Sequence, residues 1–181
     1  MRKLLCLLIL LSLFVYLPVF AQTYDHTINA KEISFSWKID KDTIHIKLSG
    51  KTDGWVGIGF NPEKKMKGAN FILGMIKRGK VKITDHFGNG IRSHRSDKKL
   101  GGKSHIKNKR GSEVSGVTEV MFSIPLNSGD RYDKLINPSG NTIVFLALGA
   151  GRDSFNSRHK AKYIYKLDLT TGKYSKMKHF H

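Results

Sequence analysis

The sequence has 181 residues, and 32 Lys or Arg stand against 14 Asp or Glu, giving a formal net charge of +18. This length suits one domain rather than two. An apolar fraction of 39% is too high for a disordered polycation. The single cysteine, Cys6, excludes an intramolecular disulfide and any cysteine-based zinc or iron–sulfur site.

Residues 1–21 have the pattern of a secretory signal peptide. Arg2 and Lys3 precede an uncharged, leucine-rich run that Pro18 ends, and Val19 and Ala21 supply small residues at the −3 and −1 positions. We expect cleavage after Ala21, with an uncleaved anchor as the alternative. The mature chain is then a single domain of residues 22–181, secreted or periplasmic, with no transmembrane span.

The pattern of the mature chain predicts mostly short strands, in which apolar and polar residues alternate. The stretches with apolar and polar residues in alternation, or with a short apolar run, are 33–39, 44–48, 55–60, 70–76, 80–83, 117–124, 142–148 and 163–167. Arg78-Gly79 lies between two of them and predicts a hairpin. One short turn of helix is expected within 126–136. The pattern predicts an all-β fold, an antiparallel β-sandwich of the immunoglobulin type, with a closed barrel as the alternative.

Basic residues are concentrated between Lys77 and Arg110, where twelve occur beside only two acids. Little apolar periodicity follows Phe87, so this region is expected to form long, mobile loops in which His94 and His105 are solvated. One interpretation of the charge is a solvated surface. The other is attraction to an acidic redox partner protein or an anionic envelope surface. The secretion signal argues against nucleic acid.

Motifs of nucleophilic or phosphate chemistry, such as G-x-S-x-G or a Gly-rich phosphate loop, are absent from the sequence. The sequence therefore shows no motif of a catalyst, and we expect that the protein is not an enzyme. Met66 is unusual, because this apolar thioether sits among lysines in the polar connection 61–68. Its role is either a loop anchor or a soft ligand for a metal or haem iron.

Several stretches, in order along the chain, resemble the DOMON family of extracytoplasmic β-sandwiches, one branch of which binds haem b. They are Thr52-Asp53-Gly54-Trp55-Val56-Gly57-Ile58-Gly59-Phe60-Asn61, Met66-Lys67-Gly68-Ala69-Asn70-Phe71-Ile72-Leu73-Gly74, Asp85-His86-Phe87-Gly88, residues 118–126 with Asp130, Ala147-Leu148-Gly149, and Asp153-Ser154-Phe155-Asn156-Ser157-Arg158-His159. One departure is Asn70, which stands where the family usually has an acid. The amide keeps an acceptor oxygen but loses the charge.

The resemblance to the haem-binding branch, which includes the cytochrome domain of cellobiose dehydrogenase, implies a non-covalent haem b with Met/His ligation. Met66 and His159 match the two axial positions. This ligation suits one-electron transfer, since it leaves iron without an open site. The expected pocket walls are Trp55, Phe60, Phe71 and Phe145, and the expected propionate partners are Lys67 and Arg158.

Two other functions remain open at this point. A haem-free module of the same fold would bind a carbohydrate or another small ligand, with Trp55 or Tyr132 stacking on a sugar ring. A structural polycation would bind anionic polymers without any cofactor.

Overall fold

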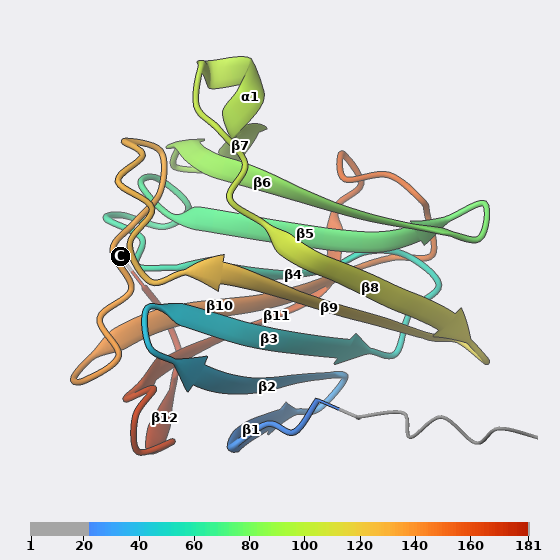
Figure 1. Cartoon of the computed structure of the whole chain (residues 1–181). Coiled ribbons are helices and arrows are strands. Elements are labelled where there is room, and N and C mark those ends of the chain that lie inside the picture. Colours follow the sequence, from blue (N-terminus) through green and yellow to red (C-terminus); the bar gives the residue numbers. More distant parts are fainter. Residues whose placement is uncertain (1–21, 181) are drawn as a thin grey trace, which may run out of the picture.

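The structure, a computed structural model, describes residues 22–180 as two antiparallel sheets packed face to face (Figure 1). The five-stranded sheet has the order β1 (His26–Ala30), β2 (Ile33–Asp40), β3 (Thr43–Gly50), β9 (Val117–Pro125), β8 (Lys107–Val114). The seven-stranded sheet has the order β12 (Tyr174–Met177), β11 (His159–Leu167), β10 (Thr142–Gly149), β4 (Val56–Phe60), β5 (Asn70–Lys77), β6 (Lys80–Gly90), β7 (Ser93–Ser96). The predicted β-sandwich is confirmed.

The core lies between the two sheets and follows from the alternation along each strand. In β3, Ile44, Ile46 and Leu48 are fully buried, while His45 and Lys47 between them are partly exposed. In β10, Val144, Leu146 and Leu148 likewise face the interior. Each strand therefore presents one side to the core and the other side outward.

The predicted hairpin at Arg78-Gly79 joins β5 to β6, and Lys77 pairs with Lys80 across it. Both turn residues have positive φ, 51° at Arg78 and 71° at Gly79. Two positive φ values define the turn type whose twist matches that of antiparallel strands, and glycine adopts the second position without strain.

Two expectations about irregular regions are wrong. Residues 77–110 are not long mobile loops, because they contain all of β6 and β7, the helix α1 (Asp97–Leu100) and the start of β8. The segment 126–136 contains turns but no helix. Backbone hydrogen bonds hold it in place, for example the one that Ile136 N donates to Leu126 O at 2.8 Å.

The expected signal peptide, residues 1–21, lies outside the described residues. Within residues 22–180, the protein has no helix that is long and apolar enough to span a bilayer.

Candidate functional site

The outward side of the seven-stranded sheet has two glycines at its centre. Val56, Ile58 and Phe60 of β4 face the core, so Gly57 and Gly59 between them face outward. A Cβ added at Gly59 would overlap the Phe71 ring, and one added at Gly57 would come within 2.5 Å of Leu73. Because Gly57 and Gly59 have no side chain, side chains of the neighbouring strand β5 pack directly on their backbone.

Apolar side chains cover this surface, which we call the outer apolar face. It consists of the cluster Trp55, Leu73, Met75, Ala147 and Phe155 together with the ring series Phe71, Phe145 and Phe180. Trp55, Leu73 and Met75 are buried although they lie outside the inter-sheet core. An apolar surface on the outside of a sandwich is a candidate ligand site.

Of the four predicted pocket walls, three lie on the outer apolar face. The Phe71 and Phe145 rings are 6.4 Å apart, and Trp55 donates from Nε1 to Ser157 Oγ at 2.9 Å. The assignment of Phe60 to the same wall is wrong. This residue is fully buried in the inter-sheet core, because it alternates with Gly59 along β4.

Met66 lies in the connection between β4 and β5, against the end of β6. Gly68 N donates to Gly88 O and Gly88 N donates to Ala69 O, both at 2.8 Å, and Met66 is half-buried. Lys67 is exposed next to it. The Met66 loop, residues 61–69, is thus held on the outer side of Gly88.

His159 begins β11, where it pairs with Gly149, and both His159 and Arg158 are exposed. The preceding segment, residues 150–158, runs over the outer apolar face. Lys77 Nζ donates to Asp153 O at 3.1 Å, and the Phe155 ring lies 6.1 Å from that of His86. This segment therefore covers part of the outer apolar face, where three of the four predicted pocket walls lie.

The structure does not bring Met66 and His159 together. The register places Met66 beside the Phe60 end of β4 and His159 beside the Val56 end, with β10, β4 and β5 between β11 and β6. Strand spacing and rise then put the two backbones about 20 Å or more apart. Met66 and His159 remain predicted ligands, and their convergence requires His159 to leave its pairing with Gly149 as well as movement of residues 150–158.

Sequence reasoning missed a histidine pair on the same outer side. His86 Nδ1 and His94 Nδ1 are 2.9 Å apart, and His86 Nε2 lies 3.1 Å from Thr84 Oγ1. His94 is half-buried beside Phe71, not solvated as expected. The two rings meet only because β6 pairs with β7. The spacing of the two histidines in the sequence does not by itself indicate that they are in contact.

The histidine pair resists protonation. Burial lowers the pKa of His86 to about 4, helped by the neighbouring His94 and by Lys99 and Lys82. Burial also lowers the pKa of His94. Both rings are therefore neutral at pH 7 and are able to accept as well as donate hydrogen bonds.

The neutral pair predicts loss of stability in mild acid. An unfolded histidine has a pKa near 6.5. As the pH falls from about 6.5 towards 4, the unfolded chain binds a proton that folded His86 does not, so the free energy of unfolding decreases. His86→Phe removes this dependence and keeps an aromatic ring against Phe155 and Phe71. Between pH 7 and 4 the variant should lose about 2 kcal/mol less than the wild type, with screening of the partly exposed ring allowed for.

Urea unfolding at pH 7, 6, 5 and 4 measures this difference, and His45→Asn on the other sheet is the matched control. Parallel curves for wild type and His86→Phe would contradict the assignment.

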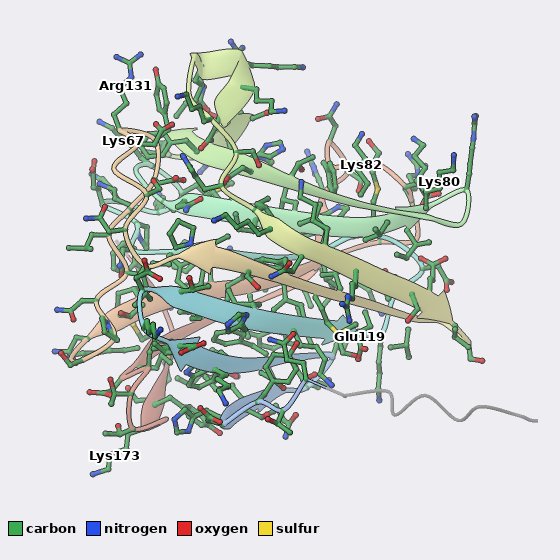
Figure 2. All side chains as sticks on the ribbon, viewed as in Figure 1. Lys67, Lys80, Lys82, Glu119, Arg131 and Lys173 are labelled. Atoms are coloured by element: carbon green, nitrogen blue, oxygen red, sulfur yellow. The ribbon has the colours of Figure 1, made fainter. Side chains whose placement is uncertain are left out.

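Basic side chains are distributed over several edges of the molecule. Figure 2 shows Lys67 and Arg131 towards the end that carries α1, Lys80 and Lys82 near the β5–β6 turn, and Lys173 beside β12. In the part of the chain that the structure describes, few of them are in ion pairs: Lys47, Lys134 and Lys160 are within ion-pair distance of Glu119, Glu63 and Glu32, respectively. The surface is therefore cationic on more than one side.

Comparison with known proteins identifies the family. The DOMON domain matches residues 29–149. The chain belongs to the DOMON family. Among curated relatives, DBH-like monooxygenase protein 1 from Mus musculus is 27% identical over 109 residues and the Homo sapiens protein is 28% identical over 109 residues. Each match covers 60% of this chain but 17% of the relative, so the DOMON domain corresponds to a small part of those proteins.

Two solved structures share the DOMON fold of this chain. The cytochrome b domain of pyranose dehydrogenase from Coprinopsis cinerea superposes with a TM-score of 0.59 at 13% identity, covering 77% of this chain and 78% of that one. The cytochrome domain of Myriococcum thermophilum cellobiose dehydrogenase gives 0.56 at 13% identity, covering 81% and 82%. At such low identity the likeness establishes the fold alone.

Proposed function

We propose that this DOMON domain is an extracytoplasmic b-type cytochrome that carries single electrons through a haem b bound on the outer apolar face. One observation carries the proposal: an apolar, aromatic surface with Gly57 and Gly59 at its centre lies outside the core of a fold that two cytochrome domains share. An apolar surface with few polar groups is the environment that a porphyrin requires.

The donor chemistry fits haem b, and the present ligand positions fit it only after a rearrangement. Met66 and His159 would hold the iron, with Trp55, Phe71 and Phe145 against the ring. Lys67 and Arg158 are exposed and cationic, as propionate partners must be. Phe155 and Phe71 occupy the face, so residues 150–158 have to move away and His159 has to leave its pairing with Gly149 at the start of β11. A Met/His-ligated haem supplies a one-electron couple of raised potential without an open iron site.

Haemin titration of the purified full chain tests this proposal. The wild type should show a sharp Soret band with low-spin α and β bands after reduction, and Met66→Leu or His159→Ala should shift these bands and weaken uptake by at least about tenfold. The matched controls are Met121→Leu and His45→Asn on the five-stranded sheet, and they should bind as the wild type does. No haemin uptake, or an unchanged spectrum in both ligand variants, would overturn the assignment.

The histidine pair provides a further arm of this experiment. His86 and His94 lie on the same outer side as Met66, and both have lowered pKa values that keep an imidazole nitrogen free of its proton. If His94→Phe abolishes the low-spin bands and His159→Ala leaves them intact, the imidazole ligand is His94 and the proposed role of His159 is wrong.

The second candidate function is a haem-free module that binds a carbohydrate or another small ligand. Phe71 and Leu73 pack over Gly59 and Gly57 and fill the face that a porphyrin would need, which argues against haem and not specifically for a sugar. A colourless protein that takes up no added haemin would favour this function.

The excess positive charge supports docking onto an acidic redox partner or an anionic envelope surface, and the sequence of residues 1–21 supports secretion or a periplasmic location. The rate of association with such a partner should fall as ionic strength rises, because salt screens the electrostatic attraction.

A further inference from the structure

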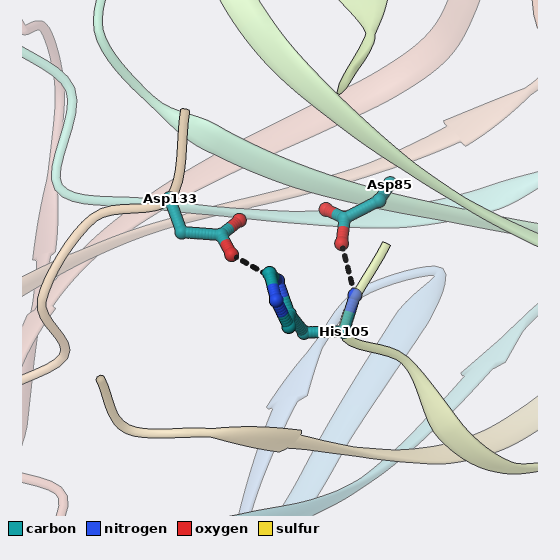
Figure 3. A group of neighbouring side chains, drawn as sticks. All are labelled: Asp85, His105 and Asp133. Carbon is teal, nitrogen blue, oxygen red and sulfur yellow. Dashed lines mark hydrogen bonds and ion pairs between the residues drawn. The ribbon is translucent and has the colours of Figure 1, made fainter. Parts of the chain in front are cut away.

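A group of buried carboxylates lies at the end of the molecule that carries α1, away from the outer apolar face. Asp85 is on the inward side of β6, Asp97 begins α1, and Asp133 is in the connection between β9 and β10. Figure 3 shows the Asp85 and Asp133 carboxylates turned towards each other beside His105. One possible ligand atom each from Asp85, His105 and Asp133 lies within 4.8 Å of the other two.

His105 provides hydrogen-bond partners for only some of the carboxylate oxygens in this group. Its backbone N donates to Asp85 Oδ2 at 3.3 Å, and its ring Nδ1 is 2.8 Å from Asp133 Oδ2. The second oxygens of both carboxylates, Asp85 Oδ1 and Asp133 Oδ1, are buried without a hydrogen-bond partner.

Asp97 has the fewest hydrogen-bond partners of the three aspartates. Its side chain is 0% exposed and neither carboxylate oxygen has a partner. Within residues 22–180 no Lys or Arg lies at ion-pair distance from Asp97 or Asp85, although the chain has 32 basic residues. Lys109 is near Asp85, but its Nζ donates to Ile83 O at 3.0 Å. Among the described residues, therefore, no ammonium or guanidinium group pairs directly with Asp85 or Asp97.

Asn70 gives independent evidence for a ligand, and its side chain is uncharged. It is 4% exposed, and its Oδ1 is also buried without a partner. Asn70 pairs with Phe87 and Ile72 pairs with Asp85, so Asn70 and Asp85 are diagonal neighbours on the inward side of the β5–β6 pair. A fourth oxygen acceptor is thus turned to the side of the sheet where the carboxylates lie.

Burying carboxylates without a cation is costly, and the effect on their protonation is large. Burial raises the pKa of Asp85 to about 7 and that of Asp97 to about 8, and in each case the neighbouring carboxylates raise it further. A bound divalent cation reverses this penalty, because it neutralises the acids and gives their free oxygens a partner.

We propose that Asp85, Asp97 and Asp133 bind a divalent cation of the oxygen-preferring class, with Ca²⁺ as its representative and Asn70 Oδ1 as an additional neutral ligand. Carboxylate and amide oxygens are the ligands of hard cations, and Ca²⁺ accepts six to eight of them in flexible geometry. The His105 ring then has a supporting role, since it holds Asp133 in position.

Such a site would join three segments that are distant in the sequence. It would tie α1 and the β9–β10 connection to β6, and Asn70 would link it to β5 directly after the Met66 loop. The cation would therefore stabilise the end of the sandwich that holds Met66, whether or not haem binds.

Calorimetric titration of chelator-treated full chain with Ca²⁺, together with thermal unfolding, tests this site. The wild type should bind one Ca²⁺ and unfold at a higher temperature with Ca²⁺ than without it. Asp97→Asn and Asp85→Asn should each weaken binding by at least about tenfold and lose the thermal shift. Asp40→Asn, an exposed acid of β2, is the matched control and should behave as the wild type does.

Asn70→Asp guards against the possibility that the weakened variants only fold badly. It adds a negative ligand at the position of Asn70 Oδ1, so it should bind Ca²⁺ more tightly, about tenfold or more, because the affinity of oxygen sites increases with ligand charge. Absence of Ca²⁺ binding, binding of Zn²⁺ but not Ca²⁺, or unchanged affinity in Asp97→Asn and Asn70→Asp would each overturn the proposal.

Discussion

Trp37→Ala is expected to lower the free energy of unfolding by about 3–5 kcal/mol, the range for removal of a large buried aromatic side chain. Trp37 is fully buried in β2, and its ring stacks on Phe35 with centroids 4.6 Å apart. Its Nε1 donates to Leu169 O at 2.9 Å, which ties β2 to the segment after β11. The substitution therefore leaves a cavity and an unpaired buried carbonyl.

Two further variants separate these contributions. Trp37→Phe keeps most of the buried ring and loses the indole donor, so we expect a smaller loss of about 1–2 kcal/mol. Tyr174→Ala removes an aromatic side chain that is 50% exposed and should change stability by less than about 1 kcal/mol. Urea unfolding, followed by circular dichroism, measures all three. A loss below about 1 kcal/mol in Trp37→Ala would show that Trp37 does not anchor the core.

Strands buried on one side were predictable from the sequence, because side-chain alternation and burial agree in them. β3 alternates Ile44, Ile46 and Leu48 with polar residues, and the alternation alone gives both its strand character and its inward side. The Arg78-Gly79 turn was predictable as well, since a glycine between two alternating stretches favours a tight hairpin.

Strands at the sheet edges were not predictable, because edge strands carry charge. β8 has the sequence KNKRGSEV, and β7 has SHRS; each lies at the edge of its sheet. Lysine and arginine on an edge discourage pairing with another chain, so these strands lack the apolar alternation that identifies a strand. The same charges led to the incorrect expectation of mobile basic loops.

The candidate sites depend on contacts that no local pattern contains. His86 and His94 meet through the β6–β7 pairing, and Asp85 and Asp133 are 48 residues apart in the sequence. The lysine-rich context of Met66 singled out this residue, the resemblance matched it to a ligand position, and Trp55 and Phe71 were expected as pocket walls. This expectation did not distinguish Phe60 from them, because the inward or outward side of β4 is fixed by register with β5 and β10.

Gly88→Ala should displace the Met66 loop while leaving the two sheets paired. A Cβ at Gly88 would overlap the Met66 carbonyl oxygen, and this neighbour is backbone that cannot turn aside as a side chain can. Two backbone hydrogen bonds of 2.8 Å, Gly68 N to Gly88 O and Gly88 N to Ala69 O, hold the same contact. We expect a loss of about 1–3 kcal/mol in the free energy of unfolding, the usual range for overpacking, towards its upper end.

The functional consequence of Gly88→Ala follows from the position of Met66. If Met66 is an axial ligand, moving its loop should weaken haemin uptake by at least about tenfold in protein that is still folded by circular dichroism. Gly151→Ala is the matched control, because a Cβ there meets no atom within 4 Å, and it should change stability by less than about 0.5 kcal/mol. A Gly88→Ala protein with wild-type stability would show that the Met66 loop is not held by this contact. A Gly88→Ala protein that is destabilised but takes up haemin normally would separate the loop from the haem site, because a ligand cannot keep its affinity when the segment that positions it has moved.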